Sequence, residues 1–141
     1  MRLFFDTSVL IPAFQLTHEQ HEASNRVLAQ VLEHSAACGA HTLAEFYSVL
    51  TRLPAPHRLE PDQAFFGIEQ IAAHFDVIAL DAQEYLREIR NAATAKIPGG
   101  QIYDFLLLAC ARKAMADQIL TWNLKHFRQL APDLADRIVT P

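Results

Sequence analysis

The order of the periodic segments constrains the fold of this 141-residue chain more than any other feature. Short apolar segments alternate with longer ones in which apolar residues recur every three or four positions, as on one face of a helix. The expected strands are 3–5, 36–40, 75–80, 118–121 and, as a possible fifth, 137–140. The expected helices are 19–34, 42–53, 61–74, 82–96, 101–115 and 124–130. Strands that alternate with helices indicate βα units, so we expect an α/β fold with a parallel sheet of four or five strands and helices on both faces.

Composition limits the class of protein. The length suits a single domain, 1–141, and the longest apolar run, 105–111, is far shorter than the roughly 20 residues of a membrane span. No secretory signal precedes the first acid, so we expect a cytoplasmic protein. Cys38 and Cys110 lie in apolar surroundings without a CxxC motif, which predicts two reduced, buried thiols. The net charge of −4 disfavours a broad basic face for nucleic acid, but it allows an acidic pocket that bound cations neutralise.

Four oxygen-bearing side chains are predicted at one edge of the sheet. Asp6 follows the first strand directly, Glu45 lies one turn into the helix after the second, and Asp104 lies in the first turn of an apolar helix. Asn123 follows the fourth strand. In a parallel α/β sheet, ligands collect beyond the carboxyl ends of the strands. The inferred topology can therefore bring all four residues to one crevice.

Each of these residues also has a purely structural interpretation. Asp6 and Asn123 can cap the helices that follow them. The segment 42–45, "TLAE", matches a capping box, and Asp104 is favoured by the helix dipole whatever its role. No single position distinguishes a site from a set of helix caps.

A second capping-box pattern, formed by Asp81 and Glu84 in "LDAQEYL", provides the contrast. We assign these two acids to helix capping alone.

The predicted convergence of Asp6, Glu45 and Asp104 points to a metal site. Several carboxylates that face one another repel, and such a cluster is costly unless cations occupy it. Oxygen ligands without His or Cys suit Mg²⁺ or Mn²⁺, and such ions can activate a water for attack on a phosphodiester. The sequence thus indicates hydrolysis without a protein nucleophile.

Four motifs together resemble the PIN-domain ribonucleases, specifically the small VapC-type toxins of bacterial and archaeal toxin–antitoxin pairs. They are "FFDTSVL", "TLAEFYSVLTRL", "GGQIYDFLLLACA" and "ILTWNLKHF", and they span nearly the whole chain in this order. The resemblance implies a compact parallel-sheet fold and metal-dependent cleavage of RNA, with Asp6, Glu45 and Asp104 as the metal-holding catalytic acids. Thr7 and Thr121 match hydroxyl residues that shape the site.

The fourth acidic position of the family matches Asn123, an amide that can offer a carbonyl oxygen but no charge. We therefore expect one firmly bound Mg²⁺ or Mn²⁺ ion and a second that arrives with RNA. His126 could approach a phosphate or the antitoxin, or it could be a solvated helix residue.

The resemblance also implies partners: an RNA substrate, a cognate antitoxin protein and a second copy in a homodimer. Apolar residues that could form an antitoxin surface, or simply belong to the core, are Phe14, Leu16, Phe46, Tyr47, Phe65 and Phe66. Scattered cations are weak candidates for RNA contacts or solvated surface residues, and they are Arg52, Arg58, Lys96, Lys125 and Arg128.

Rival readings are separated by the residues around the first acid. A response-regulator receiver needs adjacent acids after the first strand, and a haloacid-dehalogenase-like phosphatase needs Asp-x-Asp, whereas Thr7 and Ser8 follow Asp6 here. The stronger alternative is a catalytically inert PIN-like module that acts in a protein or DNA-regulatory complex, which Asn123 leaves open.

Overall fold

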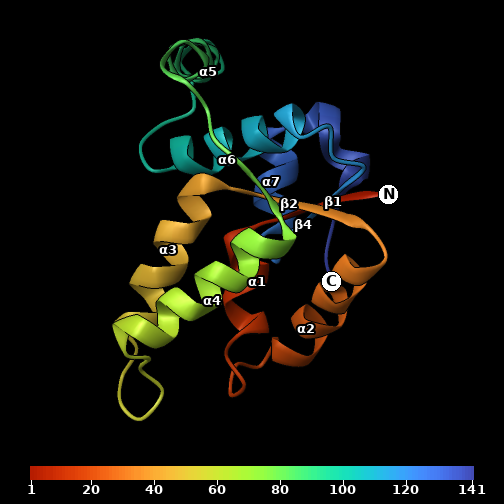
Figure 1. Cartoon of the computed structure of the whole chain (residues 1–141). Coiled ribbons are helices and arrows are strands. Elements are labelled where there is room, and N and C mark those ends of the chain that lie inside the picture. The colour runs from red at the N-terminus through yellow and green to blue at the C-terminus, as the bar shows by residue number, and fades with distance from the viewer.

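A computed structural model describes all residues from 1 to 141. Its centre is a parallel five-stranded sheet with strand order β3-β2-β1-β4-β5 (Figure 1). The strands are β1 (Arg2–Phe5), β2 (Ser35–Gly39), β3 (Asp76–Ile78), β4 (Gln118–Leu120) and β5 (Ile138–Val139). The predicted parallel α/β fold is confirmed, and the possible fifth strand is present.

The helices cover both faces of this sheet (Figure 1). They are α1 (Thr7–Ala13), α2 (His21–Ala29), α3 (Ala40–Thr51), α4 (Pro61–His74), α5 (Ala82–Thr94), α6 (Gln101–Lys113) and α7 (Leu124–Leu130), with 3₁₀ turns η1 (Gln30–Leu32) and η2 (Pro132–Arg137). Helices α1 to α4 lie on one face, α6 and α7 lie on the other, and α5 packs on the outside of α6. None of the helices is long and apolar enough to cross a membrane.

The two core layers follow from the alternation of side chains along each strand. In β1, Leu3 and Phe5 pack with α1 to α4, while Phe4 packs with α6 and α7. The same alternation places Cys38 in the first layer, whereas Cys110 of α6 belongs to the second. The sheet therefore separates the two thiols, which confirms the prediction of buried, unpaired cysteines. Burial raises the pKa of Cys38 to about 12 and that of Cys110 to about 11.

Several predicted helix ends were wrong, for local reasons. The helices expected to reach 96 and 115 end at Thr94 and Lys113, because Lys96 and Met115 adopt positive φ values of 57° and 53°. The segment expected to be one helix from 19 to 34 is the shorter α2 followed by the 3₁₀ turn η1.

The predicted start of α3 was also wrong, and the capping box that the pattern at 42–45 allowed is absent. The chain turns into α3 directly at Gly39, which is its N-cap, so Thr42 already lies in the first turn. A Cβ at Gly39 would lie 2.7 Å from Leu107 Cδ1, so glycine lets α6 approach the end of β2 closely. Glu45 is therefore free of a capping role.

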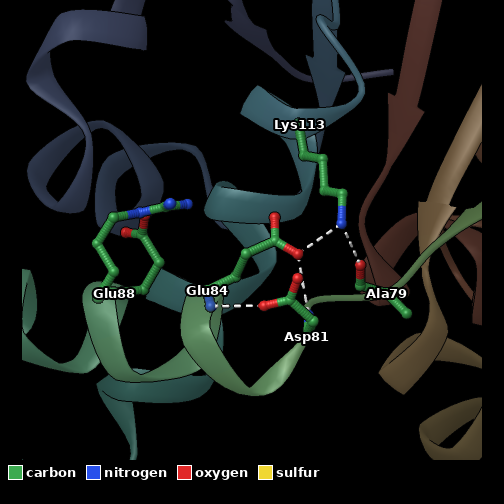
Figure 2. Close-up of polar contacts among 6 residues, drawn as sticks. Ala79, Asp81, Glu84, Glu88 and Lys113 are labelled. Carbon is green, nitrogen blue, oxygen red and sulfur yellow. Dashed lines mark hydrogen bonds and ion pairs between the residues drawn. The ribbon is translucent and has the colours of Figure 1, made fainter.

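The start of α5, by contrast, has the expected capping box (Figure 2). The Glu84 N–H donates to Asp81 Oδ1 at 2.8 Å, and the Asp81 N–H donates to Glu84 Oε1 at 3.0 Å. Lys113 Nζ of α6 donates to the same Glu84 oxygen at 2.6 Å and to the Ala79 carbonyl at 2.8 Å. These bonds tie the segment between β3 and α5 to α6.

Candidate active site

Three acids from separate parts of the chain line one cavity at the carboxyl edge of the sheet. Asp6 follows β1, Glu45 lies in the second turn of α3, and Asp104 lies in the first turn of α6. The cavity that they line has a volume of about 150 Å³. Asn123 instead lines a neighbouring hollow together with Lys125 and His126. The predicted convergence therefore holds for the three carboxylates, with the amide beside them.

Asp6 is the most enclosed of the three, with only 3% of its surface exposed. It stands at the N-cap position of α1 but makes no side-chain cap bond. Its Oδ2 accepts from Ser8 Oγ at 2.6 Å and from Thr121 Oγ1 at 2.8 Å. Burial, opposed by these bonds and reinforced by Asp104, raises the pKa of Asp6 to about 6. The fold thus holds a carboxylate where its charge is disfavoured, which a cap would not require.

The hydroxyls that hold Asp6 are themselves fixed by the turn after β4. The Trp122 N–H donates to Ser8 Oγ at 3.0 Å, and the Asn123 N–H donates to Thr121 Oγ1 at 3.0 Å. Because each hydroxyl accepts a backbone donor, its own proton can point at Asp6. The Asp6 carboxylate is thereby oriented by residues that follow two neighbouring strands, β1 and β4.

Glu45 and Asp104 are half-buried, and each is paired with a histidine. His41 Nε2 lies 3.2 Å from Glu45 Oε1, and His126 Nε2 lies 3.1 Å from Asp104 Oδ2. Burial raises the pKa of both carboxyl groups, and each histidine opposes that rise. Asp104 further raises the pKa of Glu45 as well as that of Asp6. Asp104 therefore repels both of the other acids across the cavity.

The donor set fits a hard divalent cation. Mg²⁺ and Mn²⁺ prefer carboxylate oxygens, and a cation would relieve both the burial cost and the repulsion. In the arrangement with both histidine pairs formed, no group of three His, Cys, Asp or Glu side chains converges closely enough to hold an ion. Binding an ion by all three acids would thus require side-chain movements at Glu45 and Asp104.

The match to a family model of the PIN domain covers residues 3–131. The chain belongs to the PIN domain family. This PIN domain is 38% identical over 120 residues to Ribonuclease VapC40 of Mycobacterium tuberculosis, with 85% of each chain covered. It is 40% identical over 116 residues to Ribonuclease VapC27 of the same organism, with 82% of this chain and 80% of the relative covered. The family predicted from the four motifs is confirmed.

Solved structures share the fold at low sequence identity. A crystal structure of Mycobacterium tuberculosis VapC20, described as a Sarcin-Ricin loop cleaving toxin, matches with a TM-score of 0.68 and 16% identity, covering 88% of this chain and 92% of that one. VapBC2 from Rickettsia felis, bound to a DNA fragment from its promoter, also matches with a TM-score of 0.68 and 16% identity, covering 100% of this chain and 99% of that one.

Three polar residues of this PIN domain site were not anticipated from the sequence in their observed roles. The hydroxyl of Ser8, rather than that of Thr7, donates to Asp6, while Thr7 Oγ1 donates to Thr42 Oγ1 at 2.9 Å and so joins the starts of α1 and α3. His41 was not considered, although its spacing of four residues from Glu45 on one helix was a usable signal. The pairing of His126 with Asp104 has no local sequence signal, because it joins α7 to α6.

The cations proposed for RNA contacts lie outside the cavity, which no Lys or Arg lines. Arg128 Nη2 donates to the Ile138 carbonyl at 2.9 Å, and Arg58 Nε donates to the Leu53 carbonyl at 2.8 Å, so both have structural partners. Arg52 is the C-cap residue of α3, Lys96 follows α5, and Lys125 borders the hollow beside Asn123. Of these residues, Lys125 is the one placed beside the site.

Proposed function

We propose that this protein is the ribonuclease toxin of a toxin–antitoxin pair and that it hydrolyses RNA phosphodiester bonds with a Mg²⁺ or Mn²⁺ ion held by Asp6, Glu45 and Asp104. The convergence of these three buried or half-buried carboxylates on one cavity carries the proposal. The ribonuclease relatives support the activity independently.

The residues around the cavity have different proposed roles. A divalent cation, when bound, would supply an activated water and would offset the charge that builds on the phosphodiester. Asp6, oriented by Ser8 and Thr121, gives the site one rigid carboxylate. Glu45 and Asp104, which lie 3.2 Å from His41 and 3.1 Å from His126, would supply the other oxygens to the ion. The amide of Asn123 adds no charge, so we propose one firmly held ion and a second that arrives with RNA.

The partners remain part of the proposal. The VapBC2 complex supports a cognate antitoxin, and an antitoxin can dock on the exposed apolar residues Leu16, Tyr47, Phe65 and Phe66. Phe46 is buried and Phe14 packs edge-on against it, with 5.1 Å between ring centroids, so these two belong to the core instead. We also propose a homodimer and a cytoplasmic location, as the toxin–antitoxin assignment implies.

The alternative, an inert PIN-like module, is less favoured. All three acids line the cavity, and the relatives VapC40 and VapC27 are named ribonucleases. Asn123 is compatible with catalysis, because only its backbone N–H, which donates to Thr121 Oγ1, helps to orient Asp6.

Cleavage of total cellular RNA by the purified, antitoxin-free protein tests the proposal. We expect discrete fragments with Mg²⁺ or Mn²⁺, and none with EDTA or with Asp104→Asn. Asp62→Asn is the matched control, because Asp62 is an exposed acid in the first turn of α4, away from the cavity. Fragments that persist in EDTA or in Asp104→Asn would contradict the proposed chemistry, and a folded protein that neither binds Mn²⁺ nor cuts RNA would support the inert module.

A further inference from the structure

An aromatic pair stands beside the three acids and has no part in the proposed hydrolysis. The rings of His41 and Tyr103 stack with an interplanar angle of 9° and centroids 6.0 Å apart. Both residues line the cavity, and Tyr103 is 61% exposed. A large aromatic ring left in solvent at the edge of a site is available for a ligand.

The position of this pair is coupled to the acids. Tyr103 immediately precedes Asp104 in the first turn of α6. His41 lies one turn before Glu45 in α3, and in the metal-free arrangement its Nε2 lies 3.2 Å from Glu45 Oε1. A group stacked on these rings would therefore lie next to the place where the phosphodiester is cut.

The rest of the cavity wall is mostly apolar. Ile78, Leu80 and Tyr85 face it from β3, the following segment and the start of α5. Lys113 holds this wall in place through its bonds to Ala79 and Glu84 (Figure 2). The volume of about 150 Å³ is below the roughly 300–1,000 Å³ of pockets for drug-sized ligands, and it suits one planar ring system rather than a whole nucleotide.

Charge alone does not explain how RNA would stay at this cavity. The chain has a net charge of −4, and the cavity is lined by acids without a Lys or Arg. Proteins that hold single-stranded RNA add stacking of bases on aromatic side chains to their phosphate contacts.

We propose that the His41–Tyr103 pair and the adjoining apolar wall form a stacking site for one nucleobase of single-stranded RNA, beside the scissile phosphate. This inference rests on the proposed ribonuclease function and adds a substrate contact to it. The site favours a strand whose base is free to turn out, because a base inside a duplex cannot reach it.

Nucleotide binding, measured by NMR titration with Mg²⁺ present, tests the stacking site without knowledge of the target RNA. The probes are the four nucleoside 5′-monophosphates, and ribose 5-phosphate is the probe that lacks a base. We expect at least one nucleotide to bind roughly tenfold more tightly than ribose 5-phosphate. Tyr103→Ala should abolish this difference, whereas Tyr103→Phe should retain most of it. Leu86→Ala should leave it unchanged, since Leu86 is an exposed apolar residue of α5 outside the cavity.

The outcomes separate this inference from the proposed function. Equal binding of nucleotides and ribose 5-phosphate, or full binding by Tyr103→Ala, would overturn the stacking site even if the protein cuts RNA, and would leave the aromatic pair to a protein partner. Base-dependent binding that Tyr103→Ala abolishes would support the stacking site even if no RNA is cut, in which case the ribonuclease proposal alone would fail. In a cleaving protein, Tyr103→Ala should raise KM by roughly tenfold, and Tyr103→Phe should stay near the wild-type value.

Discussion

The carboxylates at the start of α5 and those around the cavity occupy similar places in the chain but opposite physical environments. Asp81 and Glu84 follow a strand and open a helix, and their oxygens are used by backbone N–H groups and by Lys113 (Figure 2). The bond from the Asp81 backbone, together with Lys113, lowers the pKa of Glu84. Asp6, Glu45 and Asp104 also lie at strand ends or near helix starts, but burial raises the pKa of all three.

This difference distinguishes a structural acid from a functional one. Glu84 lies in an environment that favours its charge, and the Asp81 side chain caps α5, so both acids stabilise the fold. Burial in the fold opposes the charge of the cavity acids, and a bound cation would compensate for that cost. Removing an α5 acid should therefore lower stability, whereas removing a cavity acid should impair the chemistry.

The largest expected effect comes from the pair of changes Glu45→Gln and Glu84→Gln, which remove the same charge from the two regions. Glu45→Gln should lower the rate of metal-dependent RNA cleavage by at least about 100-fold, because it removes an oxygen ligand of the ion. Glu84→Gln should change that rate by less than about twofold. Cleavage assays with equal amounts of folded protein compare them, and equal losses would remove the distinction between the regions.

Asp6→Asn should stabilise the metal-free protein at neutral pH. The pKa of Asp6 rises from 3.8 to about 6 in the fold, so the native state holds a proton that the unfolded state releases in that pH range. The free energy of unfolding therefore falls as pH rises from about 4 to about 6. By pH 7 the ionised Asp6 lowers it by about 2–3 kcal/mol. Urea unfolding in EDTA should show Asp6→Asn more stable by about that amount at pH 7 and nearly equal to the wild type at pH 4.

Added Mg²⁺ provides the control for this measurement, because it should stabilise the wild type far more than Asp6→Asn. A variant that is less stable in EDTA at pH 7 would instead indicate that Asp6 serves the fold.

Asp81→Ala should have the reverse profile. It removes the side chain that accepts the Glu84 N–H at the start of α5, so we expect a loss of about 1 kcal/mol of unfolding free energy. Mn²⁺ affinity should not change, because Asp81 does not line the cavity. Isothermal titration beside thermal melting separates the two effects, and a weakened Mn²⁺ isotherm would contradict the assignment of Asp81 to capping alone.

The smallest expected effect is that of His126→Ala. The pair between His126 and Asp104 is partly exposed, and such pairs contribute about 0.2–1 kcal/mol. If a cation replaces this partner, removing the histidine should strengthen Mn²⁺ binding by up to about fivefold, whereas His74→Ala, an exposed change on α4, should have no effect. Weaker binding would mean that His126 helps to hold the ion.

The sequence by itself determined the α/β architecture and the three acids that converge. Helices α4 and α7 begin and end at the predicted residues, because Pro61 starts one and apolar periodicity defines both. Parallel strands joined by helices bring their carboxyl ends to one edge of the sheet. The convergence of Asp6, Glu45 and Asp104 could therefore be predicted from the sequence alone. Helix ends at Lys96 and Met115 were missed, since a left-handed residue other than glycine leaves little local signal.

Only the tertiary structure decided what each side chain faces. The position of the first helical residue sets the direction of every later one, so the start of α1 turns Ser8 toward Asp6 and Thr7 toward Thr42. The start of α3 at Ala40 likewise excluded the capping box that the pattern at 42–45 allowed for Glu45. The pairing of His126 with Asp104 and the stacking of His41 on Tyr103 join separate helices. Periodicity fixes the spacing of residues along one element, whereas contacts between elements depend on how those elements pack.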